Sequence, residues 1–368
     1  MAGEERSFRV TQSTRTSQIA AAVAVVVIVV LAAVPWWGGR FEMLLLGQIF
    51  AYLALASLWN LLAGFTGLVS IGQQAYVGFG GYMLFAFAVF GGVNPLLTIP
   101  IAAVLGALIA IPVGTLIFRL SGAYFAIGTW VVAEVFRLVF AQVSALGGGS
   151  GNSLPPHIVR EIAASRSIRD MIIYWTALLL VLIVIGFVYT ILRTRQGLAL
   201  TAIRDSEPAS ESLGVNIWRT KFIVYVLSAG ATSMIGALIF IQKLRISPDA
   251  AFSVNDWTAY VIFITVIGGI GRIEGPLIGT VVYFLLRELL ADLGAVYLLI
   301  LGVVAIVVML RAPRGIWGFV VERYGIELFP VQRRLRLEGL DEMKGAARKS
   351  AGAAGPDVEV AAQPVKPD

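Results

Sequence analysis

The sequence lacks cysteine entirely and carries a single histidine, His157. Without cysteine, the chain can form no disulfide, no thiol nucleophile and no thiolate-ligated zinc or iron–sulfur site. His157 lies in the polar stretch GNSLPPHIVREI, which contains no nucleophile-elbow motif. We interpret it as an ordinary loop histidine, and the sequence predicts neither catalytic residues nor a metal site.

Charge is also scarce. Only 14% of the 368 residues are charged, whereas soluble domains carry about 25%. Hydrophobic residues make up 58%, and the mean hydropathy is +0.86. These values predict an all-α, polytopic integral membrane protein. The net charge is +6, but the basic residues mostly flank apolar runs, so we interpret them as topology and lipid-headgroup determinants and expect no nucleic-acid partner.

Roughly ten apolar runs approach the length of about 20 residues that a helix needs to cross a bilayer. The run at 257–270 is short and ends in GGIG, so it could be a broken or re-entrant piece. We therefore predict about eight to ten transmembrane helices. The runs are 19–34, 43–63, 68–90, 95–118, 123–141, 171–191, 220–241, 257–270, 276–290 and 295–310.

Polar segments flank this membrane domain, which we place at residues 19–318. Residues 1–18 are predicted to be a cytoplasmic tail, and 319–368 a cytoplasmic tail that is partly disordered because it ends in AAGPDVEVAAQPVKPD. The first apolar run could be a signal peptide cleaved after LAA. Its length and the two tryptophans that follow, Trp36 and Trp37, favour a retained span.

The longest internal polar segment, 193–221, falls on the cytoplasmic side by the placement of lysine and arginine. Its middle predicts a short helix with an N-cap at Asp205 or Ser206, an acidic first turn at Glu207 and a stop at Gly214. Such a helix could dock a partner or simply link two spans. The residues alone leave both interpretations open.

The stretch GLVSIGQQAYVGFGGYM, residues 67–83, places five glycines and two glutamines inside an apolar run. Glycines permit close helix contact or a helix break. An amide that faces lipid loses its hydrogen-bond partners at a cost in free energy. The segment therefore either packs helices together or lines a pathway. Its candidate residues are Ser70, Gly72, Gln73, Gln74, Tyr76 and Gly78.

A second interrupted run, GGIGRIEGPLIGT at 268–280, carries Gly271 and Gly275 on one predicted helix face. Paired interrupted segments in transporters mark the substrate route, so an internal repeat with 67–83 is a hypothesis. Glu134 and Arg137, spaced i,i+3, predict an intramembrane ion pair that is either structural or a gate. We interpret the charges of QKLRISPDAAFSVNDW as solvated loop charges or a docking rim.

Taken in order, these stretches resemble the permease subunits of branched-chain (LIV-type) amino acid ABC importers, specifically the longer of the two permease types. The resemblance covers about residues 40–320. It is carried by LLAGFTGLVSIGQQAYVGFGGY, RLSGAYFAIGTWVVAEVFRLV, LGGGSGNSL, ALTAIRDSEPASESLGVNIWRTKFIVYVLSA, IGGIGRIEGPLIGTVV and LRAPRGIWG.

The resemblance implies half of an importer in a bacterial inner membrane. Its partners would be a second homologous permease, two cytosolic ABC ATPase subunits and an extracytoplasmic substrate-binding protein. ATP and Mg²⁺ would bind the partner subunits and no cofactor this chain, which has no GxxxxGK[ST] loop. The helix that couples to the ATPases would correspond to Arg204, Asp205, Glu207, Ala209 and Gly214.

The implied solutes are branched-chain or other small hydrophobic amino acids. The sequence departs from the family where Gln73-Gln74 replaces a frequent His-Ala, and where Pro208 precedes Ala209-Ser210 in place of two alanines. The first departure keeps urea or short amides open as solutes. An ion-driven secondary transporter would need intramembrane carboxylates, for which Glu134 and Glu288 are the candidates.

Overall fold

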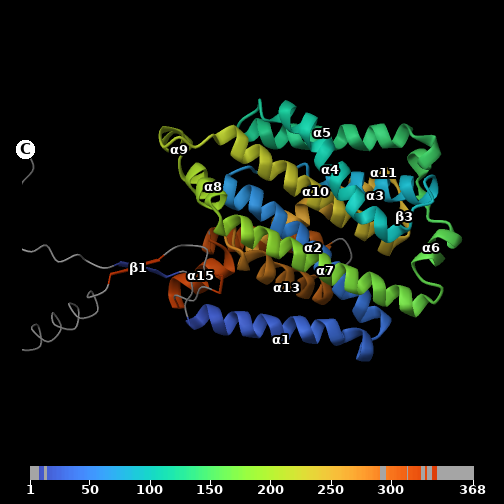
Figure 1. The fold of residues 1–368 in the computed structure, drawn as a ribbon, viewed down its shortest axis with the longest axis horizontal. Helices are drawn as coiled ribbons and strands as arrows, with labels where there is room; N and C mark the ends of the chain where they lie inside the picture. Colours follow the sequence, from blue (N-terminus) through green and yellow to red (C-terminus); the bar gives the residue numbers. More distant parts are fainter. Residues whose placement is uncertain are drawn as a thin grey trace, which may run out of the picture.

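The computed structural model describes residues 8–11, 15–290, 296–312, 314–324, 328–329 and 334–337. Long helices run side by side along one axis, with short helices gathered at the two ends (Figure 1). The long helices are α1 (Arg15–Trp37), α2 (Arg40–Thr66), α3 (Gln73–Val89), α4 (Pro95–Ile117), α5 (Ala123–Gln142), α7 (Arg166–Arg193), α10 (Ile217–Lys243), α13 (Glu274–Leu289) and α14 (Val296–Arg311).

The shorter elements mark the two ends of the bundle. We call these the α9 end and the α6 end. The short elements are α6 (Pro156–Ile162), α8 (Arg195–Asp205), α9 (Glu207–Ser212), α11 (Pro248–Ala251), α12 (Tyr260–Gly268), α15 (Gly315–Tyr324), the 3₁₀ turns η1 (Ser144–Leu146) and η2 (Gly148–Ser150), and the π-helical turn η3 (Asn255–Ala259). Two small antiparallel sheets pair β1 (Phe8–Thr11) with β4 (Arg334–Leu337) and β2 (Asn152–Ser153) with β3 (Arg245–Ile246).

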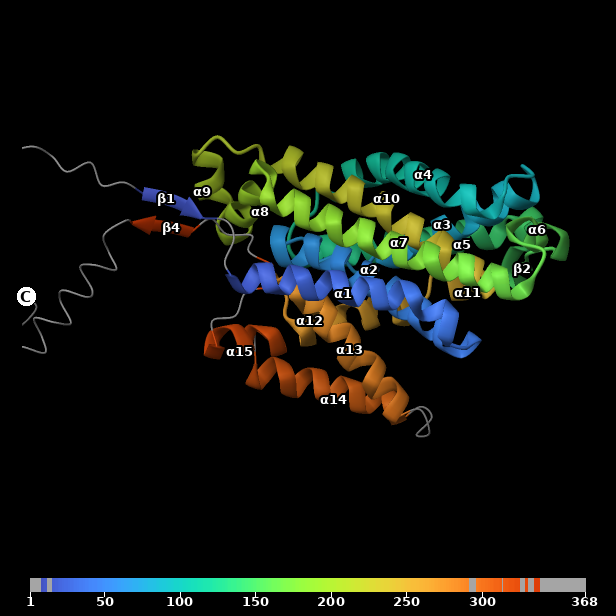
Figure 2. The same cartoon turned by 60° about the horizontal axis from the view of Figure 1, so that its bottom comes forward.

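Within the described residues, eight helical segments are long and apolar enough to span a membrane. This confirms the all-α, polytopic fold and agrees with the predicted range of eight to ten. The remaining long helices, α3 with 17 residues and α13 with 16, are shorter but lie within the same bundle (Figure 2). The end of the C-terminal tail that was predicted to be disordered, AAGPDVEVAAQPVKPD, lies outside the described residues, whereas residues 319–324 belong to α15.

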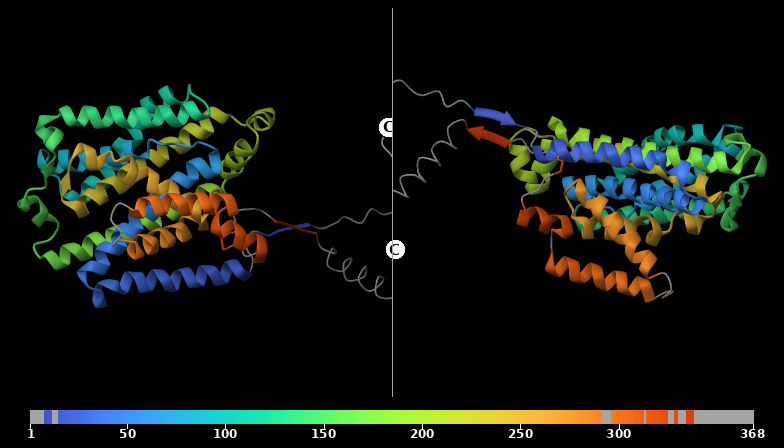
Figure 3. Two further views of the ribbon diagram at one scale, coloured as in Figure 1. Left: turned by 180° about the vertical axis from the view of Figure 1, so that it is seen from behind. Right: turned by 90° about the horizontal axis from the view of Figure 1, so that it is seen from below.

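The packing core lies where α10 meets α3 and α4, and where α2 meets α7. Small residues allow these contacts. A β-carbon added to Gly80 of α3 would lie 1.9 Å from the Ser233 carbonyl oxygen of α10, so the two backbones touch there. By contrast, α1 runs along the outside of the bundle and α14 projects from it (Figure 3).

The sequence-based boundaries were wrong at two places. Residues 68–72 were expected to begin a span, but they are not helical and α3 starts at Gln73. Residues 248–256 were expected to form a loop, yet the helical segment Pro248–Gly268 is a 21-residue candidate span. Its start is fixed by the Ser247 side chain, which accepts a hydrogen bond from Ala250 N at 3.4 Å, as an N-cap does.

Candidate functional site

The chain between α2 and α3, residues 67–72, runs back into the bundle without helical structure. Gly67 reverses the chain with a left-handed φ of 73°. The indole N–H of Trp59 then donates to the Ser70 carbonyl at 2.8 Å, and Ile71 N donates to the Thr129 hydroxyl at 3.0 Å. Backbone groups at membrane depth must be paired inside the protein, and these side chains pair them.

Gln73, the first residue of α3, shows how deep this break reaches. Its side-chain N–H donates to the Leu55 carbonyl at 3.0 Å, and Leu55 lies 11 residues before the end of α2 at Thr66. At 1.5 Å per residue, α3 begins about 16 Å inside the end of α2. The helix therefore starts deep within the bundle, where Gly72 N donates to the Ser70 hydroxyl at 3.2 Å and Ala75 N donates to the Gly72 carbonyl at 3.0 Å.

A polar cluster surrounds this helix start. Gln74 accepts a hydrogen bond from the Thr258 hydroxyl, and the hydroxyls of Tyr76 and Tyr225 lie 2.7 Å apart. The second group on each amide is unpaired among the described residues: Gln73 Oε1 and Gln74 Nε2 both lack a partner. An unpaired buried polar atom is costly, so it marks a place where a water or a ligand can bind.

A small cavity adjoins this cluster. Its volume is about 20 Å³, enough for one water molecule, which needs about 10–15 Å³. The Ser228 hydroxyl, also unpaired among the described residues, contributes to its lining. The polar residues around the cavity are Ser70, Gln73, Tyr76, Ser228, Tyr225 and Thr232. The structure thus brings Ser70, Gln73 and Tyr76 of the prediction together.

The remaining glycines of this stretch make close contacts. A β-carbon on Gly72 would lie 2.2 Å from the Thr129 carbonyl oxygen of α5, and one on Gly78 would lie 2.3 Å from the Phe252 ring. Any side chain at either position would force α3 away from its neighbours. These two glycines therefore contact protein on the sides that would carry a side chain.

The second interrupted stretch forms a tight turn between α12 and α13 at the α9 end. Gly271 has a left-handed φ of 76°, and its N–H donates to the Asn60 side chain at 2.8 Å. The same Asn60 amide donates to the Arg272 carbonyl at 2.7 Å. A β-carbon on Gly275 would lie 2.0 Å from the Gly269 carbonyl oxygen, so the two backbones are in direct contact.

Glu134 and Arg137 form the predicted ion pair on α5, with 2.6 Å between Arg137 Nη2 and Glu134 Oε1. Arg137 also donates to Asp249 at 2.8 Å, which joins α5 to α11. The Asp249 side chain is 81% exposed, but it lies on a helix and not in the predicted loop. The pair lies near the α6 end, because Arg137 is in the last two turns of α5.

The polar segment 193–221 folds into two helices, α8 and α9, joined at Ser206. The Ser206 hydroxyl accepts from Ala209 N at 3.4 Å, and Glu207 begins the helix. Gly214 follows with a left-handed φ of 82°, and nothing lies within 4 Å of the position its β-carbon would take. This confirms the predicted cap, first turn and stop of a short helix.

Arg204 and Glu207 tie this helix pair to the bundle. Arg204 donates to the Gly64 carbonyl of α2 at 3.0 Å and to Asp205 at 3.0 Å. Glu207 pairs with Lys221 of α10, whose side chain is only 10% exposed. The outer surface of α9 remains solvent-accessible, so α8 and α9 present a surface that is fixed to α2 and α10 from behind.

A cleft of about 810 Å³ opens beside this helix pair, between α9, the start of α10, the α4–α5 connection and the non-helical residues 67–69. Glu207 and Lys221 lie on one wall, and Val69 and Phe118 on the other. The cleft therefore connects the broken segment before α3 with the surface helix α9.

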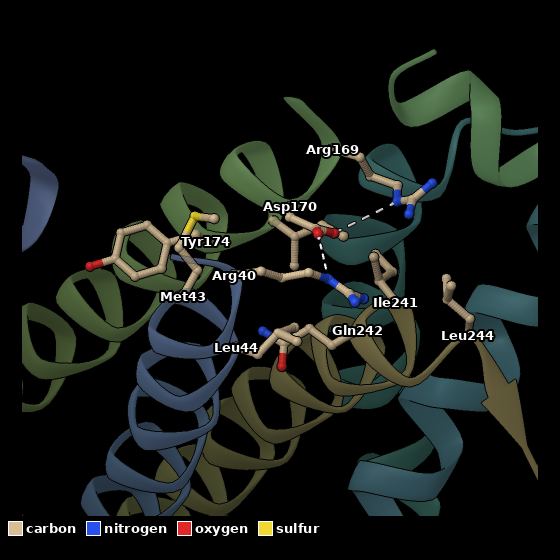
Figure 4. Close-up of a pocket in the computed structure, with 10 residues that line it drawn as sticks. Arg40, Met43, Leu44, Arg169, Asp170, Tyr174, Ile241, Gln242 and Leu244 are labelled. Carbon is tan, nitrogen blue, oxygen red and sulfur yellow. Dashed lines mark hydrogen bonds and ion pairs between the residues drawn. The ribbon is translucent and has the colours of Figure 1, made fainter. Parts of the chain in front are cut away.

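The α6 end carries a separate ionic contact that the sequence did not reveal. Asp170 of α7 accepts from Arg40 Nε of α2 at 2.9 Å, and Arg169 Nε lies 3.9 Å from its other oxygen (Figure 4). The Asp170 side chain is 9% exposed. The Arg40–Asp170 pair joins the start of α2 to the start of α7, and Arg169 adds a second guanidinium group from α7 itself.

Several residues that shape these sites were missed. Asn60 was detectable in principle, because an amide inside the apolar run 43–63 calls for a partner. Trp59, Tyr225 and Ser228 carried no such signal, since their types are ordinary in apolar helices. Their roles depend on which helices become neighbours, and no spacing along the chain encodes that.

Broken helices, a buried polar cluster and a helix pair fixed at one end define a class of protein: an all-α, multi-pass membrane transport subunit. Residues 41–310 match the family described as "Branched-chain amino acid transport system / permease component". Because the match spans most of the chain, the protein belongs to this family and is a multi-pass inner-membrane permease.

Curated relatives agree with this assignment. The high-affinity branched-chain amino acid transport system permease protein LivM of Salmonella typhimurium is 26% identical over 287 residues, which is 72% of this chain and 67% of the relative. The LivM protein of Escherichia coli is 25% identical, covering 76% and 70%. The fructose import permease protein FruG of Bifidobacterium longum is 25% identical over 55% of this chain and 62% of its own. No solved structure matches the chain significantly.

Proposed function

We propose that this chain forms half of the translocation pathway of an ATP-binding cassette importer for branched-chain or other small hydrophobic amino acids. It pairs with a second permease, receives solute from an extracytoplasmic binding protein, and takes energy from two ATPase subunits that bind ATP and Mg²⁺. The α9 end then faces the cytoplasm. The names of the LivM relatives support the solute, and the membership of the family supports the architecture.

The observation that carries the proposal is the helix α9. It is short, exposed on its outer side and capped at both ends, and it is anchored to the membrane helices through Glu207–Lys221 and Arg204–Gly64. A force applied to α9 is therefore transmitted directly to α10 and α2. That is the mechanical requirement for a subunit that holds no nucleotide site and must follow a partner's ATP cycle.

The mechanism that fits this geometry is alternating access. ATP-driven closure of the two ATPases moves α8 and α9, and α10 and α2 move with them. The cleft beside α9 and the polar cluster at the start of α3 lie on these same helices. Their displacement would open the pathway toward one side while closing it toward the other.

The test is a Gly214→Pro variant in the assembled importer, reconstituted in proteoliposomes. Proline cannot adopt a φ of 82°, and it also removes the N–H that donates to the Glu211 carbonyl at 2.9 Å. We expect normal membrane insertion and ATP-driven uptake of leucine reduced at least about tenfold. Gly214→Asn is the matched control, because asparagine tolerates the left-handed conformation, and it should retain most uptake.

A charge reversal tests the anchor separately. Glu207→Lys should reduce uptake, and the exchange Glu207→Lys with Lys221→Glu should restore it if the ion pair is what matters. Full uptake in Gly214→Pro, or solute movement by the chain without ATP, would overturn the proposal. The second result would favour a secondary transporter.

A further inference from the structure

A cavity at the α6 end, distinct from the cluster at the start of α3, lies between α2, α10, the η3–α12 segment and α13. Its volume is about 370 Å³, within the range of about 300–1,000 Å³ that small-ligand pockets occupy. It adjoins the contact of Arg40 and Asp170, because Leu44 and Gln242 line both places. This edge of the cavity therefore lies beside the ion pair that joins α2 to α7.

The floor of this cavity is aromatic. Tyr52 stacks on Trp257 with ring centroids 5.9 Å apart, and it meets Tyr283 at 5.7 Å. Tyr52 is 8% exposed, Trp257 3% and Tyr283 1%. The indole N–H of Trp257 donates to the Ala250 carbonyl at 2.8 Å, which fixes the ring. The rings thus form a rigid apolar base, and the partly exposed Leu44 and Tyr260 add apolar surface that can accept an aliphatic side chain.

The rim of the cavity carries charges of both signs. Lys243 Nζ lies 4.6 Å from the centre of the Trp257 ring, and Arg287 Nη1 donates to the side-chain oxygen Oε1 of Gln48 at 3.4 Å. Asp256 lies on the same rim, and among the described residues no lysine or arginine forms an ion pair with it. One anion and two cations therefore border the cavity without neutralising each other by direct contact.

The backbone at this site is irregular. Residues Asn255–Ala259 form a π-helical turn, η3, between α11 and α12. The wider turn places Asp256, Trp257 and Tyr260 along one cavity. Single π-turns cost helix stability and occur frequently at functional sites. The turn gives a reason beyond composition to regard the cavity as a binding site.

Aromatic and basic residues also gather at membrane interfaces without binding anything. Interfacial rings contact lipid headgroups and are therefore exposed at the protein surface. Trp36 and Trp37 fit that description, with 73% and 69% exposure. Trp257 and Tyr283 do not, because both are buried against protein. The cavity floor is thus internal and is not part of the interfacial belt.

We infer that this cavity is a low-affinity site for a free zwitterionic α-amino acid with an aliphatic side chain. The side chain rests on Tyr52, Leu44 and Tyr260, Asp256 binds the ammonium group, and Arg287 with Lys243 binds the carboxylate. Charges on a rim above an apolar floor match the two ends of such a solute. The choice of solute rests on the proposed function; the site itself rests on the charges and rings.

The experiment measures leucine binding to the full-length chain in phosphatidylglycerol nanodiscs by saturation-transfer NMR, without ATP or binding protein. Leucinamide lacks the carboxylate and 4-methylpentanoate lacks the ammonium group, so each should bind at least about tenfold more weakly than leucine. This comparison needs no variant, and misfolding cannot confuse it.

Variants then locate the site. Asp256→Asn and Arg287→Gln should each weaken leucine binding about tenfold, a loss of about 1.4 kcal/mol. The matched controls are Glu288→Gln and Arg245→Gln, which alter nearby charges that do not line the cavity, and they should stay within about twofold. Leucine bound equally well by Asp256→Asn and Arg287→Gln would overturn the inference, as would no binding by the wild-type chain.

The headgroup of phosphatidylethanolamine carries the same pair of charges, so a second set of nanodiscs contains that lipid. If phosphatidylethanolamine abolishes leucine binding, and amino acids without an aliphatic side chain bind as well as leucine in its absence, the cavity is a lipid site. That result would overturn the inference. ATP-driven uptake by the assembled importer is measured in parallel. Absent uptake with intact leucine binding contradicts the proposed function alone, whereas normal uptake with no leucine binding contradicts the site alone.

Discussion

Two breaks in the membrane helices, residues 67–72 and residues 269–273, are tied to α2 by consecutive side chains. Trp59 holds the first through the Ser70 carbonyl, and Asn60 holds the second through Gly271 and Arg272. Neighbours on a helix point about 100° apart, so α2 stands between the two breaks and contacts each on a different face. Its backbone is therefore the common support of both irregular segments.

The two breaks differ in what holds them. The first is non-helical, reaches into the bundle, and is held by the side chains of Trp59 on α2 and Thr129 on α5, while Gln73 at its end bonds to α2. The second is a tight turn at the α9 end where glycine backbones meet directly. A β-carbon on Gly268 would lie 1.8 Å from the Gly275 carbonyl oxygen.

This difference indicates different mechanical roles. A segment held by a few side-chain hydrogen bonds can rearrange by exchanging partners, each worth about 0.5–1.5 kcal/mol net. A segment held by backbone contact moves only as a rigid body, because no side chain can adjust. We therefore expect the first break to change shape during transport and the second to move as a unit with α12 and α13.

The largest effect should come from adding one methyl group beside the second break, where α12 packs against α13. In Gly279→Ala, the new β-carbon would lie 1.8 Å from the Ile264 carbonyl oxygen, so α12 and α13 must separate. We expect a loss of at least about 3 kcal/mol, or no folded protein. The measurement is thermal unfolding in detergent, followed by size-exclusion chromatography.

The control for this prediction is Gly186→Ala on α7, where nothing lies within 4 Å of the added atom. Alanine is the better helix former by about 1 kcal/mol, so this variant should be unchanged or slightly more stable. A Gly279→Ala protein as stable as Gly186→Ala would show that the helices flanking the second break are not held together by backbone contact.

Changing the two side chains on α2 should give intermediate and unequal effects. Asn60→Leu leaves the Gly271 N–H and the Arg272 carbonyl without this partner, whereas Trp59→Phe frees only the Ser70 carbonyl. Each buried group left unpaired costs about 1–3 kcal/mol. Asn60→Leu should therefore lower the melting temperature more than Trp59→Phe does.

A lower melting temperature for Trp59→Phe than for Asn60→Leu would contradict this comparison of the two breaks. It would mean that the first break depends more heavily on α2 than the second does. Equal losses would indicate that water replaces one of the two contacts to Asn60. The double variant adds a further check. Because each residue serves a separate break, the two losses should add to within about 0.5 kcal/mol.

Local signals in the sequence predicted α9 well and the breaks poorly. Ser206, Glu207 and Gly214 act within a few residues of one another, so cap, first turn and stop could be read directly from their order. The non-helical course of 67–72 depends on Trp59 and Thr129, which belong to other helices. An apolar run containing glycine is compatible with either a continuous or a broken helix until those neighbours are known.

The polar residues of the candidate site illustrate the same limit. Gln73 and Gln74 were identified because amides are conspicuous in an apolar run. Their partners, the Leu55 carbonyl and Thr258, lie 18 and 184 residues away along the chain. Asp256 was expected in a loop, because the wide π-turn that continues the helix through it leaves no recognisable spacing in the sequence.

The smallest effect on stability should come from Gln73→Leu, and it separates packing from a role in the pathway. The Leu55 carbonyl lies within α2 and already accepts a helical hydrogen bond, so losing Gln73 leaves no group unpaired. The substitution also removes the unpaired Gln73 Oε1, which offsets the lost bond. We expect a change in unfolding free energy within about 1 kcal/mol.

Transport should nevertheless respond. If the amide lines the pathway, Gln73→Leu reduces ATP-driven uptake several-fold at unchanged stability, while Gln73→Asn keeps the amide and retains part of the activity. Uptake that stays normal in Gln73→Leu would make the residue a packing element only. It would also weaken the claim that the first break changes shape, because the helix start that Gln73 marks would then be only a fixed structural feature. The pair of measurements, one on unfolding and one on uptake, is needed because either alone is compatible with both roles.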